Sequence, residues 1–488
     1  MPTSPIHLCI VQPGGNVHAL GFLDQARFFR HQFRRLGAQV SLGKNRLRHD
    51  ALNFVFGAHA GFETGLTERF RCVFVNLEQL GEGGSRVSQA YLQLLAASMV
   101  VDYEAANVAA YSNDADVAIV SFGHAPYLSR EPVMPIEERP VDLLFFGSMN
   151  ERRMAMLQQI EAGGCRVAVL PYGIFGPERD VEIRRAKAVF NCHFYESARF
   201  EQARVFQCLS LGTPVISERS ARAAPPQQFE DSVFWVAPDA IKPFFERNFR
   251  APDFADAARA KLRNFTSHDV LDQYAEVLAR AERHFATRTG ASTPWRPERL
   301  HIGSGKDYMP GWFNVDILEL AQPDALLDLS APLELPARID CATVGPVELC
   351  ADSLSFIYAN NVLEHVGDLP RLMTNCLHLL KHGAQMLIEV PYEKALAAWQ
   401  DPTHVRAFNE RSWIYYAEWF WYLGWFESRF TVVSLEYLDE RNAVVEREQA
   451  SFMRVRLEKV ATSAVERTIA RAMRADFGGV EEDGEGEY

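Results

Sequence analysis

Two glycines and a carboxylate stand where a ligand could be held at the edge of a predicted sheet. Residues 300–317, LHIGSGKDYMPGWFNVDI, are expected to form a strand, a glycine turn and a second strand that ends on Asp316. Glycine at positions 303 and 305 would let the backbone approach a ligand without a Cβ in the way. Ligands of open parallel sheets bind beyond the carboxyl ends of the strands, where Asp316 would accept the hydroxyls of a ribose. The alternative is an ordinary turn without a ligand.

Three later segments continue this pattern. Asp328, in DLSAPLEL, lies in the next connection, where it would meet an adenine amino group or cap a helix. Residues 354–366, LSFIYANNVLEHV, are expected to form a strand, a polar turn and the start of a helix. Residues 379–392, LLKHGAQMLIEVPY, are expected to form a helix end, a glycine turn and a further strand.

Residues 300–460 resemble class I S-adenosyl-L-methionine (SAM)-dependent methyltransferases in the order and type of these segments. NVLEHV is similar to the segment after the fourth strand of that family, and LLKHGAQMLIEVP to its LLKPGG stretch. The resemblance implies that the glycine turn lines the methionine part of SAM, that the acid of the second strand holds the ribose, and that an asparagine lies near the methyl donor. The implied SAM-binding residues are Gly303, Ser304, Gly305, Asp316, Asp328, Asn360 and Asn361.

Methyl transfer to a hydroxyl requires a base that works near neutral pH, which histidine provides best. His365 follows Glu364 beside the predicted SAM site, and His404 lies in the polar cluster DPTHVRAF. We predict that one of these histidines is the catalytic base, and that Asp401 and Arg406 position the acceptor, such as a sugar. The alternative for each histidine is a structural role, bonded to a neighbouring carboxylate.

Residues 1–290 carry two series of alternating strand-like and helix-like segments. The first series runs from IHLCIV to DVAIVSFG, and the second from VDLLFFGS to TPVISE, with the proline-rich linker SREPVMPIEERP between them. This alternation predicts two parallel sheets with helices on both faces. A cleft between two such sheets suits nucleotide-sugar chemistry.

Residues 5–285 resemble a bacterial group of GT-B glycosyltransferases related to spore-coat CgeB-like proteins. The resemblance implies a nucleotide-diphosphate sugar as donor in the second sheet and an acceptor in the first. The matching segments are NLEQL (76–80), DYEAAN (102–107), LLFFGSMNERR (143–153), YGIFGPERD (172–180) and NCHFYESARFEQARVFQCLSLGTPVISE (191–218).

Several residues of these segments could bind a nucleotide sugar. A glycine–serine turn at a strand end can present amides to a diphosphate, and arginines can contact phosphate with two nitrogens. The alternatives are solvated arginines at a helix start and a surface salt bridge between Glu201 and Arg204. The predicted nucleotide-sugar-binding residues are Gly147, Ser148, Arg152, Arg153, Tyr172, Glu201 and Arg204.

The catalytic groups of this half are less evident. Related retaining enzymes carry two glutamates eight positions apart, and Arg199 and Gln207 occupy those positions here. His18, in the glycine loop PGGNVHALGF, is a predicted acceptor-side base, with a capping or core role as the alternative. No pair of aspartates follows a strand in this half, so we expect no metal.

Composition bounds the function further. The 488 residues carry a formal net charge of −13, which disfavours general nucleic-acid binding. The eight cysteines form no CxxC pair, and reduced thiols are typical of a cytoplasmic protein. The N-terminus lacks the pattern of a signal peptide, and no apolar run is long enough for a transmembrane helix.

The predicted fold class is α/β, with a GT-B pair of Rossmann-like domains followed by a class I methyltransferase Rossmann-like domain. The predicted function is bifunctional: glycosyl transfer from a nucleotide sugar, and SAM-dependent O-methylation of a sugar hydroxyl on a polysaccharide, glycolipid or glycosylated product. The alternative is an active methyltransferase with a non-catalytic GT-B module that binds glycans. The oligomeric state is left open. The predicted segments are an acceptor domain (1–130), a donor domain (131–288), a linker (289–299), a methyltransferase domain (300–460) and an acidic, disordered tail (461–488).

Overall fold

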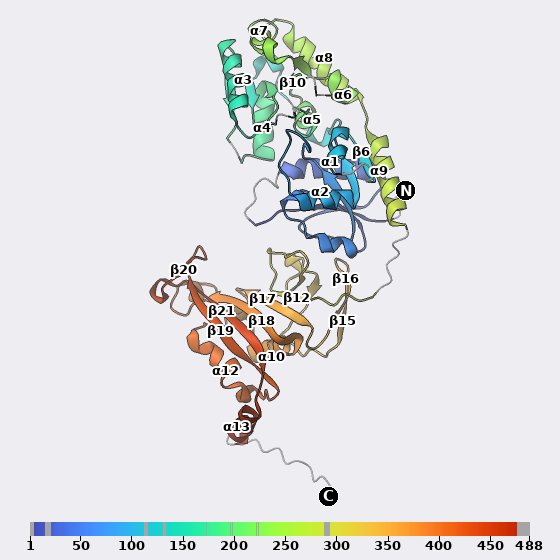
Figure 1. Ribbon diagram of the computed structural model, residues 1–488. Helices are drawn as coiled ribbons and strands as arrows, with labels where there is room; N and C mark the ends of the chain where they lie inside the picture. Colours follow the sequence, from blue (N-terminus) through green and yellow to red (C-terminus); the bar gives the residue numbers. More distant parts are fainter. Residues whose placement is uncertain are drawn as a thin grey trace. The chain divides into compact units, whose positions relative to one another are not determined.

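The computed structural model divides the chain into two compact units, Met1–Thr289 and Gly290–Tyr488 (Figure 1). Each unit is built on sheets of its own. The residues that the structure describes are 4–14, 21–111, 116–129, 133–171, 173–195, 197, 199–220, 222, 224–286 and 293–475.

The first unit begins with a parallel sheet in the order β2-β1-β3-β4-β5-β6. Its central strands are apolar and buried along most of their length, as expected for a sheet covered on both faces. Helix α1 packs on it through Phe28, Phe29 and Phe33, which lie on one face of the helix. The elements are β1 (Ile6–Ile10), α1 (Leu23–Arg35), β2 (Val40–Lys44), β3 (Leu52–Phe56), β4 (Arg71–Asn76), α2 (Gln89–Ala96), β5 (Met99–Asp102) and β6 (Val117–Ile119).

The second sheet of this unit is also parallel, in the order β11-β10-β9-β7-β8. Its strands alternate with helices along the chain, so they form a second doubly wound sheet. The elements are β7 (Val141–Phe145), α3 (Glu151–Ala162), β8 (Val167–Val169), α4 (Pro177–Arg185), β9 (Ala186–Asn191), α5 (Gln202–Ser210), β10 (Val215–Glu218), α6 (Gln227–Glu230), β11 (Phe234–Val236), α7 (Ile241–Arg247) and α8 (Phe254–Ser267).

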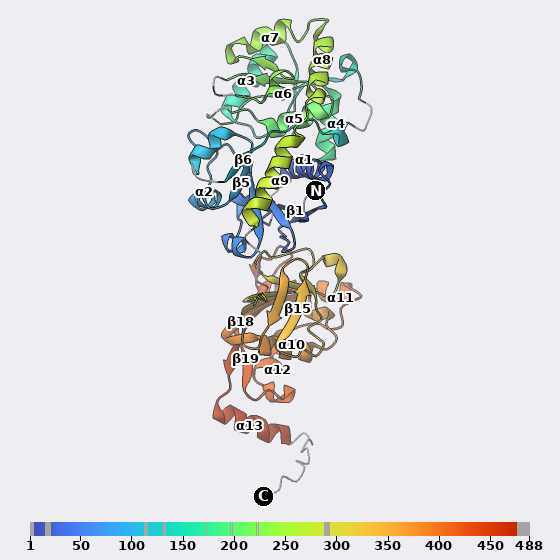
Figure 2. The same ribbon diagram turned by 90° about the vertical axis from the view of Figure 1, so that its right-hand side faces the viewer.

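A shared apolar core joins the two sheets. The ring of Phe122, which follows β6, stacks on Phe206 of α5 with centroids 4.7 Å apart. Helix α9 (Leu271–Phe285) comes after the second sheet in sequence but packs against the first, as Figure 2 shows. The Tyr274 hydroxyl donates to the Ser121 carbonyl at 3.3 Å. The two sheets are therefore held at fixed positions relative to one another.

The second unit is built on a sheet in the order β14-β13-β12-β17-β18-β21-β19-β20. The strands from β14 to β18 are parallel, and β21 is antiparallel to both of its neighbours. Counted along the chain, the parallel part has the doubly wound order 3-2-1-4-5, which reverses between β12 and β17. Its parallel strands are β12 (Arg299–Ile302), β13 (Phe313–Asp316), β14 (Ala325–Leu326), β17 (Leu354–Asn360) and β18 (Leu380–Pro391).

The remaining elements of this unit lie around and beyond that parallel part. Strands β15 and β16 form a separate hairpin. Helix α13 occupies part of the segment that is predicted from the sequence to be an acidic tail. The elements are β15 (Ala337–Cys341), β16 (Gly345–Leu349), α10 (Leu369–Leu379), α11 (Ala397–Gln400), α12 (Ile414–Ala417), β19 (Ser428–Leu438), β20 (Val444–Val445), β21 (Phe452–Ala461) and α13 (Ala464–Ala475).

The predicted fold class is confirmed: the protein is α/β and is built on parallel Rossmann-like sheets. Sequence patterns located these sheets because a strand buried on both faces reads as a continuous apolar run. Within the described residues, no helix has the length and apolar character needed to cross a membrane.

A buried histidine makes the stability of the first unit depend on pH. His7 of β1 is 5% exposed, and its Nε2–H donates to the Arg46 carbonyl at 3.0 Å. Burial lowers the pKa of His7 to about 4, from the usual 6.5. Protons therefore bind preferentially to the unfolded chain as the pH falls from 6.5 to 4, and this lowers the free energy of unfolding by about 3 kcal/mol.

We expect His7→Gln to reduce the acid-induced fall in melting temperature between pH 6.5 and 4.5, measured by calorimetry. The control His382→Gln removes an exposed histidine and should leave the fall unchanged. An equal fall in wild type and His7→Gln would contradict the assignment.

Candidate functional site

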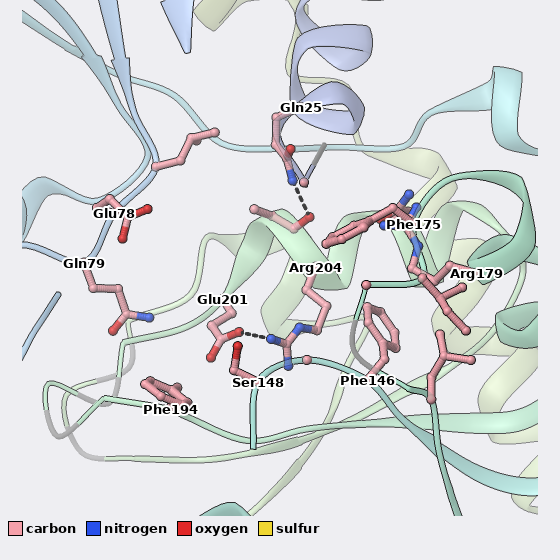
Figure 3. Close-up of a pocket in the computed structure, with 18 of the residues that line it drawn as sticks. Gln25, Glu78, Gln79, Phe146, Ser148, Phe175, Arg179, Phe194, Glu201 and Arg204 are labelled. Atoms are coloured by element: carbon pink, nitrogen blue, oxygen red, sulfur yellow. Dashed lines mark hydrogen bonds and ion pairs between the residues drawn. The ribbon is translucent and has the colours of Figure 1, made fainter. Parts of the chain in front are cut away.

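A cavity of about 360 Å³ lies between the two sheets of the first unit. Its walls come from the loop after β4, the loop after β7, residues 173–175 and the start of α5. Figure 3 shows Glu201, Arg204 and Ser148 close together, with Glu78 and Gln79 on one side and Phe146 and Phe175 on the other. Parallel strands place their following loops at the same edge, which is why segments far apart in sequence meet here.

The turn after β7 requires glycine at position 147. Gly147 has φ +127°, and a Cβ there would lie 2.7 Å from Nη2 of Arg204 and 3.2 Å from Nη1 of Arg153. Arg153 and Arg204, both predicted to bind the nucleotide sugar, therefore cover the turn that lines the cavity. The exposed Ser148 follows this turn and also lines the cavity.

Glu201 joins the two arginines. Its Oε1 accepts from Arg153 at 2.7 Å, and its Oε2 pairs with Arg204 at 2.7 Å. Burial acts to raise the pKa of Glu201, but the charges of Arg204 and Arg153 outweigh it and lower that pKa. Glu201 is thus a carboxylate with both oxygens engaged, and it holds Arg204 at the cavity wall.

The two arginines differ in their exposure and in their further partners. Arg153 is 1% exposed and also donates to the carbonyls of Ser148 and Cys192, both at 2.8 Å. The Arg204 side chain is 16% exposed, and its Nη1 has no hydrogen-bond partner among the described residues. Arg153 therefore holds the loops that line the cavity, whereas Arg204 is the more exposed of the two arginines at its wall.

Arg152 is not among the residues that line the cavity. Its guanidinium forms an ion pair with both carboxylate oxygens of Glu218, and Nη1 also donates to the His193 carbonyl at 3.0 Å. A phosphate would therefore have to displace Glu218 in order to bind Arg152 as the sequence predicts.

The matched segments NLEQL and DYEAAN meet in a buried network. Asp102 accepts hydrogen bonds from Asn76 and Asn107, both at 2.8 Å, and from Tyr111 at 3.2 Å. The Asn107 amide also donates to the Glu78 carbonyl at 2.9 Å. These buried polar residues hold the loop that brings residues 78 and 79 to the cavity.

Gln207 and Arg199, which stand where the predicted resemblance would place two glutamates, have different surroundings. Gln207 lies on α5, lines the cavity and is 2% exposed. Arg199 contacts the Asn107 side chain and takes part in the network around Asp102. Neither position therefore supplies an acid. His18 and Tyr172, predicted as a base and a nucleotide-sugar-binding residue, lie outside the described residues.

In the second unit, Asp316 and the glycine turn are in contact. The Gly305 N–H donates to Asp316 Oδ2 at 2.8 Å, and the Leu318 N–H donates to Oδ1 at 2.9 Å. Asp316 is 8% exposed. The carboxylate is thus oriented by two backbone amides at the carboxyl end of β13, and each oxygen keeps acceptor capacity for a ribose.

The other predicted SAM-binding residues lie along the same edge of the sheet. Ser304 is 2% exposed and its hydroxyl has no partner within the described chain. Asp328 is exposed, and its Oδ1 accepts from the amide and the hydroxyl of Ser330 at 2.8 and 2.6 Å. Asn360 ends β17, and Asn361 follows it with a left-handed φ of +51°.

The two predicted bases stand side by side beyond β17. The rings of His365 and His404 have centroids 4.7 Å apart. Glu364 is 1% exposed beside them, and burial raises the pKa of Glu364 to about 7. The predicted acceptor-positioning residues have partners of their own: Asp401 accepts from Thr403 at 2.6 Å, and Arg406 donates to the Val366 carbonyl at 2.7 Å.

Comparison with known proteins gives partial similarities. No family model matches the sequence. Uncharacterized protein L140 of Acanthamoeba polyphaga mimivirus is 28% identical over 164 residues, and uncharacterized protein L137 of the same virus is 24% identical over 157 residues. Each match covers 32% of this chain, and the matches cover 51% and 21% of the two viral proteins, so the chain spans about half of the first and about a fifth of the second.

Solved structures similar to this chain include glycosyltransferases and methyltransferases. A glycosyltransferase from Rickettsia africae ESF-5 is 9% identical and covers 59% of this chain and 100% of its own, with a TM-score of 0.39. The glycosyltransferase AviGT4, involved in avilamycin A biosynthesis, is 12% identical, with 58% and 98% coverage and a TM-score of 0.37. A SAM-dependent methyltransferase from Archaeoglobus fulgidus is 15% identical, with 38% and 93% coverage and a TM-score of 0.23.

Polar contacts between α1, which flanks the first sheet, and the helices α4 and α5 of the second sheet were not predicted from the sequence. Arg179 of α4 pairs with Asp24 of α1 at 3.0 Å and with Asp180 at 2.8 Å, and Gln25 donates to the Ala203 carbonyl at 3.2 Å. Asp24 and Gln25 are buried. The available signal was the pair of polar residues next to the apolar face of α1.

Glycine at position 303 is required by a close contact as well as by its backbone. Gly303 has φ +63°, and a Cβ there would overlap the side chain of Val362. Gly383 is a matched control, because it has φ +77° and a Cβ there would have nothing within 4 Å. The left-handed conformation alone costs about 1 kcal/mol in alanine.

We expect Gly383→Ala to lower the free energy of unfolding of the second unit by about 1 kcal/mol. Gly303→Ala should lower it by a further 1 to 3 kcal/mol, roughly, because of overpacking. Denaturant unfolding followed by tryptophan fluorescence measures both. Equal losses in the two variants would show that Val362 does not press on the turn.

Proposed function

We propose that the protein is a bifunctional glycan-modifying enzyme. The first unit would transfer a sugar from a nucleotide-diphosphate donor, and the second would methylate a sugar hydroxyl with SAM. The acceptor would be a polysaccharide, a glycolipid or a glycosylated product in the cytoplasm. The proposed division places the acceptor side in residues 1–130, the donor side in 131–288 and methyl transfer in 300–460.

The observation that carries the proposal is the cavity at the carboxyl ends of both sheets of the first unit. It combines a glycine turn, a partly exposed arginine and aromatic walls within about 360 Å³. A diphosphate would accept hydrogen bonds from the backbone of the turn at Gly147 and from Arg204. The sugar would then lie toward Glu78 and Gln79 of the first sheet.

Glycosyl transfer breaks the bond between the sugar and the diphosphate oxygen and forms one to an acceptor oxygen. The developing charge on the leaving diphosphate is what Arg204 would stabilise. The acceptor hydroxyl must lose a proton, for which His18 is the proposed base.

Methyl transfer in the second unit breaks a sulfur–carbon bond of SAM and forms an oxygen–carbon bond on the acceptor. The hydroxyl releases its proton, and the products are a methyl ether and S-adenosylhomocysteine. The contact between Gly305 and Asp316 supports a nucleoside site at this edge. The main work of the protein would be to align the hydroxyl oxygen with the methyl carbon.

The second candidate is an active methyltransferase with a non-catalytic GT-B module that binds glycans. It is favoured by the positions of Gln207, an amide facing the cavity, and Arg199, which is engaged by Asn107. On this alternative the cavity would bind a sugar without cleaving a donor.

An assay for donor binding and cleavage separates the two candidates. We expect the full chain to hydrolyse or transfer from at least one nucleotide sugar in a panel, and Arg204→Ala to lower kcat/KM at least tenfold, because the leaving phosphate loses a charge-assisted hydrogen bond. Arg166→Ala removes an arginine whose side chain is 88% exposed and serves as the control. Glycan binding without turnover of any donor would favour the non-catalytic module.

The SAM site is tested by calorimetry with S-adenosylhomocysteine. We expect micromolar binding to the full chain and at least tenfold weaker binding to Asp316→Ala, because the ribose loses its acceptor. Asp340→Ala, at an exposed position of β15, is the matched control. Thermal unfolding of each variant checks that the fold is kept. Equal binding by Asp316→Ala and Asp340→Ala would show that the Asp316 carboxylate does not contact the nucleoside.

A further inference from the structure

Three side chains with metal-ligating atoms converge beyond β17. Glu364 and His365 lie on a short 3-10 turn, Leu363–His365, and His404 comes from the loop after α11. One carboxylate oxygen of Glu364 and one ring nitrogen of each histidine lie within 4.8 Å of one another. Ligands about 2.1 Å from a Zn²⁺ ion stand roughly 3 to 3.4 Å apart, so the three atoms would have to approach one another by at most roughly 1.4 to 1.8 Å.

Glu364 is the unusual member of this cluster. It is 1% exposed, and neither carboxylate oxygen has a hydrogen-bond partner among the described residues. Buried polar groups are nearly always paired, and a buried carboxyl group is paired with a cation, coordinates a metal or holds a proton. The two histidine rings are its neighbours, which makes a shared cation the simplest partner.

The hydrogen bonds of both histidines leave one ring nitrogen unprotonated, as in metal-bound histidines. Nδ1 of His404 lies 3.0 Å from the Ala398 carbonyl, which can only accept, so Nδ1 carries the proton. The lone pair of His404 is therefore on Nε2. Metal-bound histidines commonly use one ring nitrogen for the ion and the other for such a hydrogen bond.

His365 is oriented through a polar relay. Its Nδ1 lies 3.0 Å from the Thr403 hydroxyl, and that hydroxyl donates to Asp401 Oδ1 at 2.6 Å. The Thr403 oxygen therefore accepts from Nδ1–H of His365, and Nε2 again keeps the lone pair. Asp401 thus holds the ring of His365 in place through Thr403.

We propose that Glu364, His365 and His404 form a binding site for a divalent first-row transition-metal ion. One carboxylate and two imidazoles suit Zn²⁺, Mn²⁺ or Co²⁺, and three protein ligands leave positions open for water or a substrate oxygen. The sequence-based expectation of no metal rested on the lack of a pair of aspartates after a strand in the first half of the chain. The geometry of the second unit points instead to a mixed oxygen and nitrogen site.

A role for this ion follows if the second unit transfers methyl groups, as proposed above. The open positions would bind the acceptor hydroxyl, and the ion would lower its pKa, so that the proton leaves to water without a histidine base. His365 and His404 would then be ligands and not bases. This role rests on the proposed function, whereas metal binding does not.

Metal binding is tested on the full chain after treatment with a chelator. We expect Co²⁺ to bind at one equivalent and give visible absorption bands, and Mn²⁺ to bind by electron paramagnetic resonance titration. His365→Ala and His404→Ala should each weaken binding at least tenfold, and Glu364→Gln at least as much. His382→Ala removes an exposed histidine elsewhere in the unit and should bind as wild type does.

The proposal is overturned if neither ion binds saturably, or if His365→Ala and His404→Ala bind as tightly as His382→Ala. His365 is exposed, so its variant decides the matter even if Glu364→Gln does not fold. Calorimetry with S-adenosylhomocysteine on the same samples separates the two ideas. Nucleoside binding without metal binding would rule out the metal site but not the proposed methyl transfer. Metal binding without nucleoside binding would rule out the proposed methyl transfer but not the metal site.

Discussion

The cavity of the first unit depends on one carboxylate held between two guanidinium groups. Arg153 is almost fully buried, and Glu201 is its counter-charge. Removing one partner of a buried ion pair costs about 3 to 5 kcal/mol, because the other charge remains without compensation. The same arginine binds the carbonyls of Ser148 and Cys192, which follow different strands. Glu201 therefore stabilises two loops at once, and it positions the second arginine, Arg204, over the glycine turn.

The second unit concentrates two features on one short turn. Val362 packs against Gly303 of the predicted nucleoside site, and Glu364 and His365 follow within the same turn. Asn361 enters this turn with a left-handed backbone, which redirects the chain as it leaves β17. Any ligand that presses on the glycine turn would therefore act through Val362 on the segment that carries the carboxylate. A nucleoside and a metal ion bound at this edge would therefore be neighbours, because the same short turn contacts both.

Much of the fold was predictable because its signals are local. Apolar runs located the buried strands, and glycines marked the turns after β7 and β12, where φ is positive at Gly147 and Gly303. The partners of charged side chains were not predictable. Arg152 and Arg153 are adjacent in sequence, yet one pairs with Glu218 and the other with Glu201. Their adjacency on a helix sends the two side chains in different directions, which a residue pattern does not encode.

The sequence by itself determined the order of strands and helices, and with it the parallel sheets of both units. The reason is that periodicity and backbone conformation depend on neighbouring residues. Only the tertiary structure decided that α9 packs against the first sheet and that His404 reaches Glu364 and His365. Such meetings join residues far apart along the chain, and they depend on how loops leave the carboxyl ends of strands. For the same reason Glu364, which the sequence presents only as a neighbour of His365, emerged as a buried carboxylate without a partner in the described chain.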